Sequence, residues 1–148
     1  MKELRDTYLS DKDKKRMTIS YLTDKLPRIL VDCIGKEKAI PKEELFKRVY
    51  GRKYQDKIKE WIMWDFVVKA MTKLRKTGYC FPISVVAEGN TYYYIPTSEE
   101  ERKPYEDMIK SRISAMKYMI KRSKKAVDEE WHKKLEKELE GKRPKALK

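Results

Sequence analysis

From residue 40 to residue 95, the pattern of apolar and polar positions predicts a helix, a longer helix and a two-stranded hairpin. Apolar residues in the longer helix recur at helical spacing and predict one buried stripe: Val67 or Val68, Met71 and Leu74. Basic residues recur at three- and four-residue steps on another face: Lys69, Lys73 and Lys76. Gly78 follows these positions, and glycine favours the left-handed backbone at a helix C-terminus. We therefore expect this helix to bury one face and to present a basic one.

The hairpin is predicted from two apolar runs, residues 79–86 and residues 91–95, which flank turn residues at 87–90. Pro82 lies inside the first run and has no N–H to donate, so that strand is expected at an edge or a bulge. Neighbouring strand residues point to opposite faces, so at least one tyrosine is expected in the core and at least one outside it: Tyr92, Tyr93 and Tyr94. Packing explains these tyrosines more simply than base stacking.

A first helix is predicted upstream, from residue 20 to residue 34. Thr23 or Asp24 can cap it, and Pro27 is tolerated in the first turn after such a cap. Five residues are expected to form its buried stripe: Leu26, Ile29, Leu30, Cys33 and Ile34.

A short extended piece at residues 39–40 is expected to precede the second helix, which starts at Pro41 and ends at Gly51. Its inward side chains are expected to be Leu45, Phe46 and Val49. The segment that follows is apolar on every helical face, and such a helix is covered on every face. Trp61 and Phe66 are therefore expected to be covered by the C-terminal helix or by a second protomer. Two interpretations stay open here: one helix over residues 56–77, or a break that lets Asp65 cap a shorter helix.

The C-terminal part is predicted as a long helix over residues 98–140, followed by a basic tail at residues 141–148. Ser98 and Glu101 have capping-box spacing, and Pro104 is expected to shorten or kink the first turn. Apolar residues recur as in a coiled-coil seam interrupted at residues 123–125: Ile109, Ile113, Met116 and Ile120, then Val127, Trp131, Leu135 and Leu139. This seam is expected to form a homodimer, or else to pack back onto its own domain.

The chain has 148 residues, of which 41% are charged, and its net charge is +13. This charge favours a polyanionic partner, either nucleic acid or an acidic membrane surface. Residues 1–19 are expected to form a basic, poorly ordered arm, either a solvated tail or an arm for the minor groove of DNA. Asn90 and Gln55 are the only side-chain amides, which together with abundant Lys and Glu is typical of thermophile proteins.

Residues that would support catalysis or metal binding are sparse. Cys33 and Cys80 have no nearby cysteine or histidine, which favours reduced, buried thiols in a cytoplasmic protein. His132 is the only histidine, and neither a zinc-binding pattern nor a glycine-rich phosphate loop is present. No signal peptide and no apolar run long enough to span a membrane are evident. We therefore expect neither an enzyme nor a membrane protein, with no cofactor, no metal and no small-molecule substrate.

The predicted order of helix, short strand, helix, helix, strand, turn and strand resembles the winged helix-turn-helix superfamily, especially small regulators of phages and other mobile elements. Three segments carry the resemblance: residues 40–45, residues 74–79 and residues 89–95. The resemblance covers about half of the chain, residues 23–95. It implies a mainly α fold with a small β-hairpin, a winged-helix domain over residues 20–97, followed by the long C-terminal helix.

In that superfamily the third helix enters the major groove, and the wing lies on the flanking backbone or the minor groove. The resemblance thus implies binding to double-stranded DNA, in regulation of transcription or of a mobile element. The candidate DNA-binding residues are Lys53, Lys57, Lys69, Thr72, Lys73 and Lys76. The candidate dimer or packing residues are Trp61, Phe66, Ile109, Ile113, Met116 and Ile120. The alternative is a winged-helix adaptor that binds a protein through its apolar surfaces and does not bind DNA.

Overall fold

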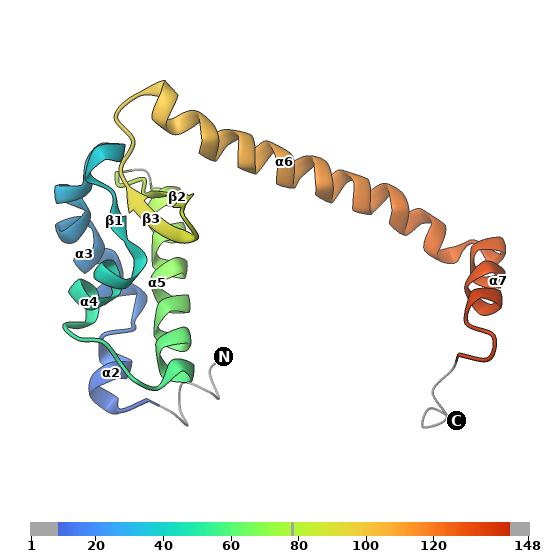
Figure 1. Ribbon diagram of the computed structural model, residues 1–148, viewed down its shortest axis with the longest axis horizontal. Coiled ribbons are helices and arrows are strands. Elements are labelled where there is room, and N and C mark those ends of the chain that lie inside the picture. Colours follow the sequence, from blue (N-terminus) through green and yellow to red (C-terminus); the bar gives the residue numbers. More distant parts are fainter. Residues whose placement is uncertain (1–8, 78, 143–148) are drawn as a thin grey trace. The chain divides into compact units, whose positions relative to one another are not determined.

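The N-terminal part of the chain combines helices with a small antiparallel sheet (Figure 1), and its buried apolar side chains form one hydrophobic core. The computed structural model describes residues 9–77 and 79–142, which divide after Tyr105 into an N-terminal unit and a C-terminal unit. The N-terminal unit contains, in order, α2 (Asp11–Lys15), α3 (Ile19–Leu30), the 3-10 helices η1 (Val31–Cys33) and η2 (Lys36–Lys38), β1 (Ile40–Pro41), α4 (Lys42–Tyr50), α5 (Lys57–Thr77), β2 (Ile83–Ala87) and β3 (Asn90–Tyr94). The fold is mainly helical with a small sheet, which confirms the predicted α+β class.

The sheet of the N-terminal unit has the strand order β1-β3-β2, and both pairs are antiparallel. Ile40 pairs with Tyr93, and Val85 pairs with Tyr92. The hairpin turns at Glu88 and Gly89, whose φ angles of 53° and 79° are both left-handed. Two left-handed residues form the turn that matches the twist of a hairpin. The first strand of the hairpin, β2, begins at Ile83 and not at residue 79. Pro82, which has no N–H to donate, therefore lies just before the hydrogen-bonded strand.

The core is formed mainly by one face each of α3, α4 and α5. On α5 the predicted stripe is confirmed, because Val67, Met71 and Leu74 are buried while Val68 is partly exposed. The inward residues expected on α4 are also buried: Leu45, Phe46 and Val49. Tyr93 and Tyr94 lie in the core and Tyr92 is half-buried, so none of the three tyrosines lies fully outside it.

The first predicted helix is misplaced at both ends. Its cap is Thr18, whose hydroxyl accepts a hydrogen bond of 3.2 Å from the Tyr21 N–H, and not Thr23 or Asp24. The α-helix ends at Leu30 and a 3-10 turn follows, so Ile34 leaves the helical stripe and is 46% exposed. Ile34 instead forms a parallel bridge to Ile95. The prediction that Ile34 is buried was therefore wrong.

The longest helix of the N-terminal unit, α5, runs without a break from Lys57 to Thr77. Asp56 caps it, because one carboxylate oxygen accepts hydrogen bonds from the N–H groups of Ile58 and Lys59 at 3.0 and 3.2 Å. This settles the open choice in favour of one helix, and Asp65 lies within it. The preceding helix α4 begins one residue later than predicted, after Pro41, and Gly51 ends it in left-handed backbone with φ 79°.

The N-terminal arm is more ordered than predicted. Residues 11–15 form α2, which Ser10 caps by accepting a hydrogen bond from the Asp13 N–H. Leu9 and Met17 join the hydrophobic core. The prediction of a poorly ordered arm was therefore wrong for residues 9–19, while residues 1–8 lie outside the described residues. The predicted helix end at Gly78 and the basic tail at residues 143–148 also lie outside them.

The C-terminal segment forms two helices where one long helix was predicted. These are α6 (Glu99–Ser123) and α7 (Glu129–Glu138), separated by the 3-10 helix η3 (Lys124–Val127). The break falls at the interruption of the apolar pattern, and Asp128 caps α7 by accepting from the Glu130 N–H. Pro104 lies within α6 and does not end it. The long C-terminal helix is therefore confirmed only as far as Ser123.

The first turns of α6 belong to the N-terminal unit. Ser98 caps the helix, as predicted, by accepting a hydrogen bond from the Glu101 N–H. The Glu101 carboxylate accepts a hydrogen bond of 2.9 Å from the Lys36 N–H, and its carbonyl accepts one from the Tyr94 hydroxyl. The Tyr105 ring meets Phe81 edge to face, with centroids 5.3 Å apart. These contacts attach residues 98–105 to η2, to β3 and to the chain before β2.

Candidate nucleic-acid interface

The exposed side of α5 carries most of the predicted DNA-binding residues. Lys69, Thr72, Lys73 and Lys76 are all exposed. They alternate with the buried residues Val67, Ala70, Met71 and Leu74, so helical periodicity separates the two sets cleanly. The structure therefore brings these four predicted residues together on one helix.

Two of these residues already have partners on the helix. The Lys69 ammonium lies 3.0 Å from the Asp65 carboxylate and 4.9 Å from the centre of the Phe66 ring. The Thr72 hydroxyl donates a hydrogen bond of 3.1 Å to the Val68 carbonyl. Lys69 remains about half exposed in this arrangement, so its charge stays accessible to an anion, although Asp65 reduces the local positive potential.

Arg75 was not among the predicted site residues. Its side chain contacts other parts of the N-terminal unit. Its guanidinium donates a hydrogen bond of 2.8 Å to the Pro82 carbonyl and lies 5.5 Å from the centre of the Tyr105 ring. Because a guanidinium bound in this way positions the start of the hairpin, we assign Arg75 a structural role.

The other two predicted residues, Lys53 and Lys57, line a groove of about 340 Å³ between α4 and the first turns of α5. Aromatic rings and charged groups share its lining, which consists of Lys42, Glu43, Phe46, Lys53, Lys57, Glu60, Trp61 and Trp64. The Lys42 ammonium lies 5.1 Å from the centre of the Trp64 ring, and the Lys53 ammonium lies 3.8 Å from the Glu43 carboxylate. Lys42 was missed because its position in the groove depends on tertiary packing.

Trp61 is 57% exposed beside this groove. Its covering by the C-terminal helix or by a second protomer stays a prediction. Phe66 is half-buried and packs against the core of its own unit. In the C-terminal unit, three of the predicted packing residues are exposed, namely Ile113, Met116 and Ile120, and Ile109 is half-buried. The predicted packing residues are thus divided between the two units.

The tip of the hairpin carries no positive charge. Glu88 and Gly89 form the turn, and the nearby Val86 is 70% exposed. An acidic tip is repelled by phosphate, so any contact of the hairpin with a nucleic acid has to come from its sides.

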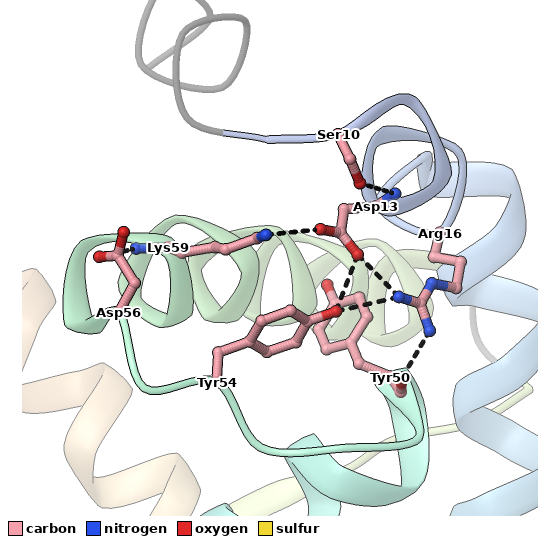
Figure 2. A network of polar contacts seen from close by, with 7 residues as sticks. All are labelled: Ser10, Asp13, Arg16, Tyr50, Tyr54, Asp56 and Lys59. Carbon is pink, nitrogen blue, oxygen red and sulfur yellow. Dashed lines mark hydrogen bonds and ion pairs between the residues drawn. The ribbon is translucent and has the colours of Figure 1, made fainter.

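A buried polar network fixes the connection between α4 and α5 (Figure 2). The Asp13 carboxylate accepts hydrogen bonds from the Tyr54 hydroxyl at 2.8 Å and the Arg16 guanidinium at 2.7 Å. Its second oxygen lies 3.0 Å from the Lys59 ammonium. Arg16 also donates to the Tyr50 carbonyl at the end of α4. The network therefore links α2, the end of α4 and the first turn of α5, next to the segment that carries Lys53 and Lys57.

The electrostatics of this network keep Asp13 charged. Only 4% of the Asp13 surface is exposed. Burial alone would raise the pKa of its carboxyl, but the hydrogen bonds from Tyr54, Lys59 and Arg16 outweigh burial and hold that pKa well below its ordinary value. Asp13 is thus a buried anion paired with two cations. The sequence pattern had predicted a poorly ordered arm at this position.

No group of three or more His, Cys, Asp or Glu side chains is arranged to hold a metal ion within residues 9–77 and 79–142. Over the same ranges, no helix has the length and apolar character needed to cross a membrane. Comparison with protein family models, with curated proteins and with solved structures finds no match to this chain.

Proposed function

We propose that this protein is a winged helix-turn-helix protein that binds double-stranded DNA with α5, in the regulation of transcription or of a mobile element. Two features of the N-terminal unit support the proposal. Its elements follow the order α3, β1, α4, α5, β2 and β3, and its sheet has the order β1-β3-β2. This is the arrangement expected of three helices followed by a wing.

The observation that carries the proposal is the row of exposed cations on α5, formed by Lys69, Lys73 and Lys76. A helix of 21 residues with one face in the core and cations along its open side suits the major groove, which admits an α-helix. Residues 23–97 hold fifteen basic and nine acidic side chains, so the domain itself attracts a polyanion.

The positions of the side chains suggest different roles in this proposal. Lys69, Thr72 and Lys73 lie within α5, where they could approach base edges. Lys76 lies at the end of α5, Lys57 at its start and Lys53 just before it. These three positions suit contacts with phosphates on either side of the groove. Glu88 at the hairpin tip supports only a modest contribution from the wing.

The experiment that tests the proposal is a titration of labelled random-sequence duplex DNA at two salt concentrations. Neutralised phosphates release counterions, so log K should fall with log salt by about 0.9 for each phosphate contacted. We expect binding at low salt that weakens steeply as salt rises. Absence of duplex binding at low salt would contradict the proposal.

A second candidate function is a protein-interaction adaptor, and the exposure of Trp61 beside an aromatic groove favours it. Large exposed aromatic side chains are typical of the centres of protein interfaces. The two functions differ in what Trp61→Ala should do. If DNA binding rests on the α5 cations, this substitution should leave the salt slope of duplex binding unchanged, whereas an adaptor would lose its partner.

A further inference from the structure

Most of the apolar row of α6 is left exposed by the described residues of the C-terminal unit, 106–142. Ile113, Met116 and Ile120 are exposed, and Ile109 precedes them at the same helical spacing. Helices of this kind gain most of their stability when such a row is packed. A covering surface for the row of α6 must be apolar at its centre and must carry charges opposite to those that border the row.

Positive charges border the apolar row of α6 on both sides. Residues 110–125 contain seven basic and no acidic side chains. Lys117 follows Ile113 by four positions, and Arg112 precedes Met116 by four, so each lies beside the row on the helix surface. Two α6 helices placed seam to seam would bring like charges together in either orientation, which disfavours pairing of α6 with itself.

The opposite charge lies on α7 of the same unit. Residues 128–140 contain six acidic and three basic side chains. The apolar residues of α7 recur at steps of four, with Leu135 and Leu139 exposed and Trp131 half-buried beside the Arg122 guanidinium. Glu138 follows Leu135 by three positions and Glu136 precedes Leu139 by three, so two acids border this second row, and Lys134 lies three positions after Trp131.

The two rows are comparable in length. At 1.5 Å per residue, the row of α6 from Ile109 to Ile120 spans about 17 Å, and the row from Trp131 to Leu139 at the end of α7 spans about 12 Å. Most residues of both rows are exposed, so α7 does not cover the row of α6 within the C-terminal unit.

We propose that the C-terminal unit is a self-association surface in which α7 of one copy packs on α6 of a second copy, and the reverse. The contact is two-fold symmetric, buries both apolar rows and places Glu136 and Glu138 beside Lys117 and Arg112. It requires no contact between like-charged helices. The proposal does not depend on DNA binding by the N-terminal unit.

The test uses two charge-reversed full-length variants. The first variant is Glu136→Lys with Glu138→Lys, after which basic residues border the apolar rows of both α6 and α7. The second variant is Arg112→Glu with Lys117→Glu, after which acidic residues border both rows. Sedimentation analysis should show that the wild type dimerises and that each variant alone self-associates about tenfold more weakly or worse. An equimolar mixture should form a heterodimer, because both α6–α7 contacts in the mixed pair join opposite charges.

A matched control makes the same change of charge as the first variant, but at acids that do not border the apolar row of α7. Glu130→Lys with Glu140→Lys alters two acids of the same segment, of which Glu130 lies on the side of α7 away from Leu135. It should dimerise like the wild type, with circular dichroism confirming retained helix in every variant. Three results would overturn the proposal: a monomeric wild type, as expected if α7 folds back on its own α6; an unaffected first variant, as expected for an α6–α6 seam; or no heterodimer in the mixture.

Discussion

The hydroxyl of Tyr54 donates a hydrogen bond of 2.8 Å to the carboxylate of Asp13, which lies 41 positions earlier in the sequence. The same carboxylate binds Lys59 in the first turn of α5. The N-terminal segment is therefore part of the structure that sets where α5 begins. Disturbing this one carboxylate should affect both stability and the segment before the proposed DNA-binding helix.

We predict that Asp13→Asn lowers the free energy of unfolding by about 3 kcal/mol, because it leaves Lys59 and Arg16 partly buried without their anion. Urea titration followed by circular dichroism would measure the change. Asp11→Asn is the matched control on the same helix, where the carboxylate is exposed and a change within about 0.5 kcal/mol is expected. Equal effects of the two substitutions would contradict the role assigned to Asp13.

The lowered pKa of Asp13 also predicts how stability depends on pH. An aspartate in the unfolded chain has a pKa of about 3.9, and the folded value is lower. The unfolded state therefore binds the proton first, so this contribution is complete above the unfolded pKa and is lost as pH falls through the folded pKa. Urea titrations from pH 7 to pH 3 should show the wild type losing more stability than Asp13→Asn below about pH 4.

For the proposed DNA contact, we predict that Lys69→Glu with Lys73→Glu weakens duplex binding by more than the roughly 1–3 kcal/mol of one specific contact. Two acids would then repel the DNA where two cations had attracted it, and the salt slope should fall by about 0.9 for each phosphate contact that is lost with them. Fluorescence anisotropy at several salt concentrations would measure both quantities. Lys36→Glu with Lys38→Glu, an equal charge change on η2, should have the smaller effect. If both double variants bind alike, α5 is not the DNA-binding element.

Neither cysteine is expected to take part in function. Burial raises the pKa of both thiols, which disfavours the reactive thiolate. Cys33→Ala with Cys80→Ser should therefore keep duplex binding, at a packing cost of about 1 kcal/mol for the buried Cys33. Loss of binding by a variant that retains its circular dichroism spectrum would show that a thiol is needed.

Much of the fold could be predicted because it follows from local periodicity. The stripe of Met71 and Leu74, the helix end at Gly51 and the cap of α6 at Ser98 each follow from residues close in sequence. The prediction failed for residues 9–19, where two partners of Asp13, Tyr54 and Lys59, lie more than forty positions away and leave no local pattern. It also failed at Ile34, whose exposure depends on a tertiary bridge to Ile95.

The candidate site was predictable to a similar extent. The spacing of Lys69, Lys73 and Lys76 sufficed to place them on an open helix face. The structural role of Arg75 could not be anticipated, because its partner is a carbonyl of the following loop. The groove that joins Lys42 to Trp64 likewise requires α4 and α5 to be packed side by side.

The pairing of Ile40 with Tyr93 affects how the chain can fold while it is being synthesised. β1 leaves the ribosome early, yet its partner strand is made only after the whole of α4, α5 and β2. At about 5–20 residues per second, the nascent chain spends several seconds with this strand edge unpaired. During that interval α3 and α4 can pack on each other and then on α5 as it emerges, and the emergence of β3 is the step that closes the sheet.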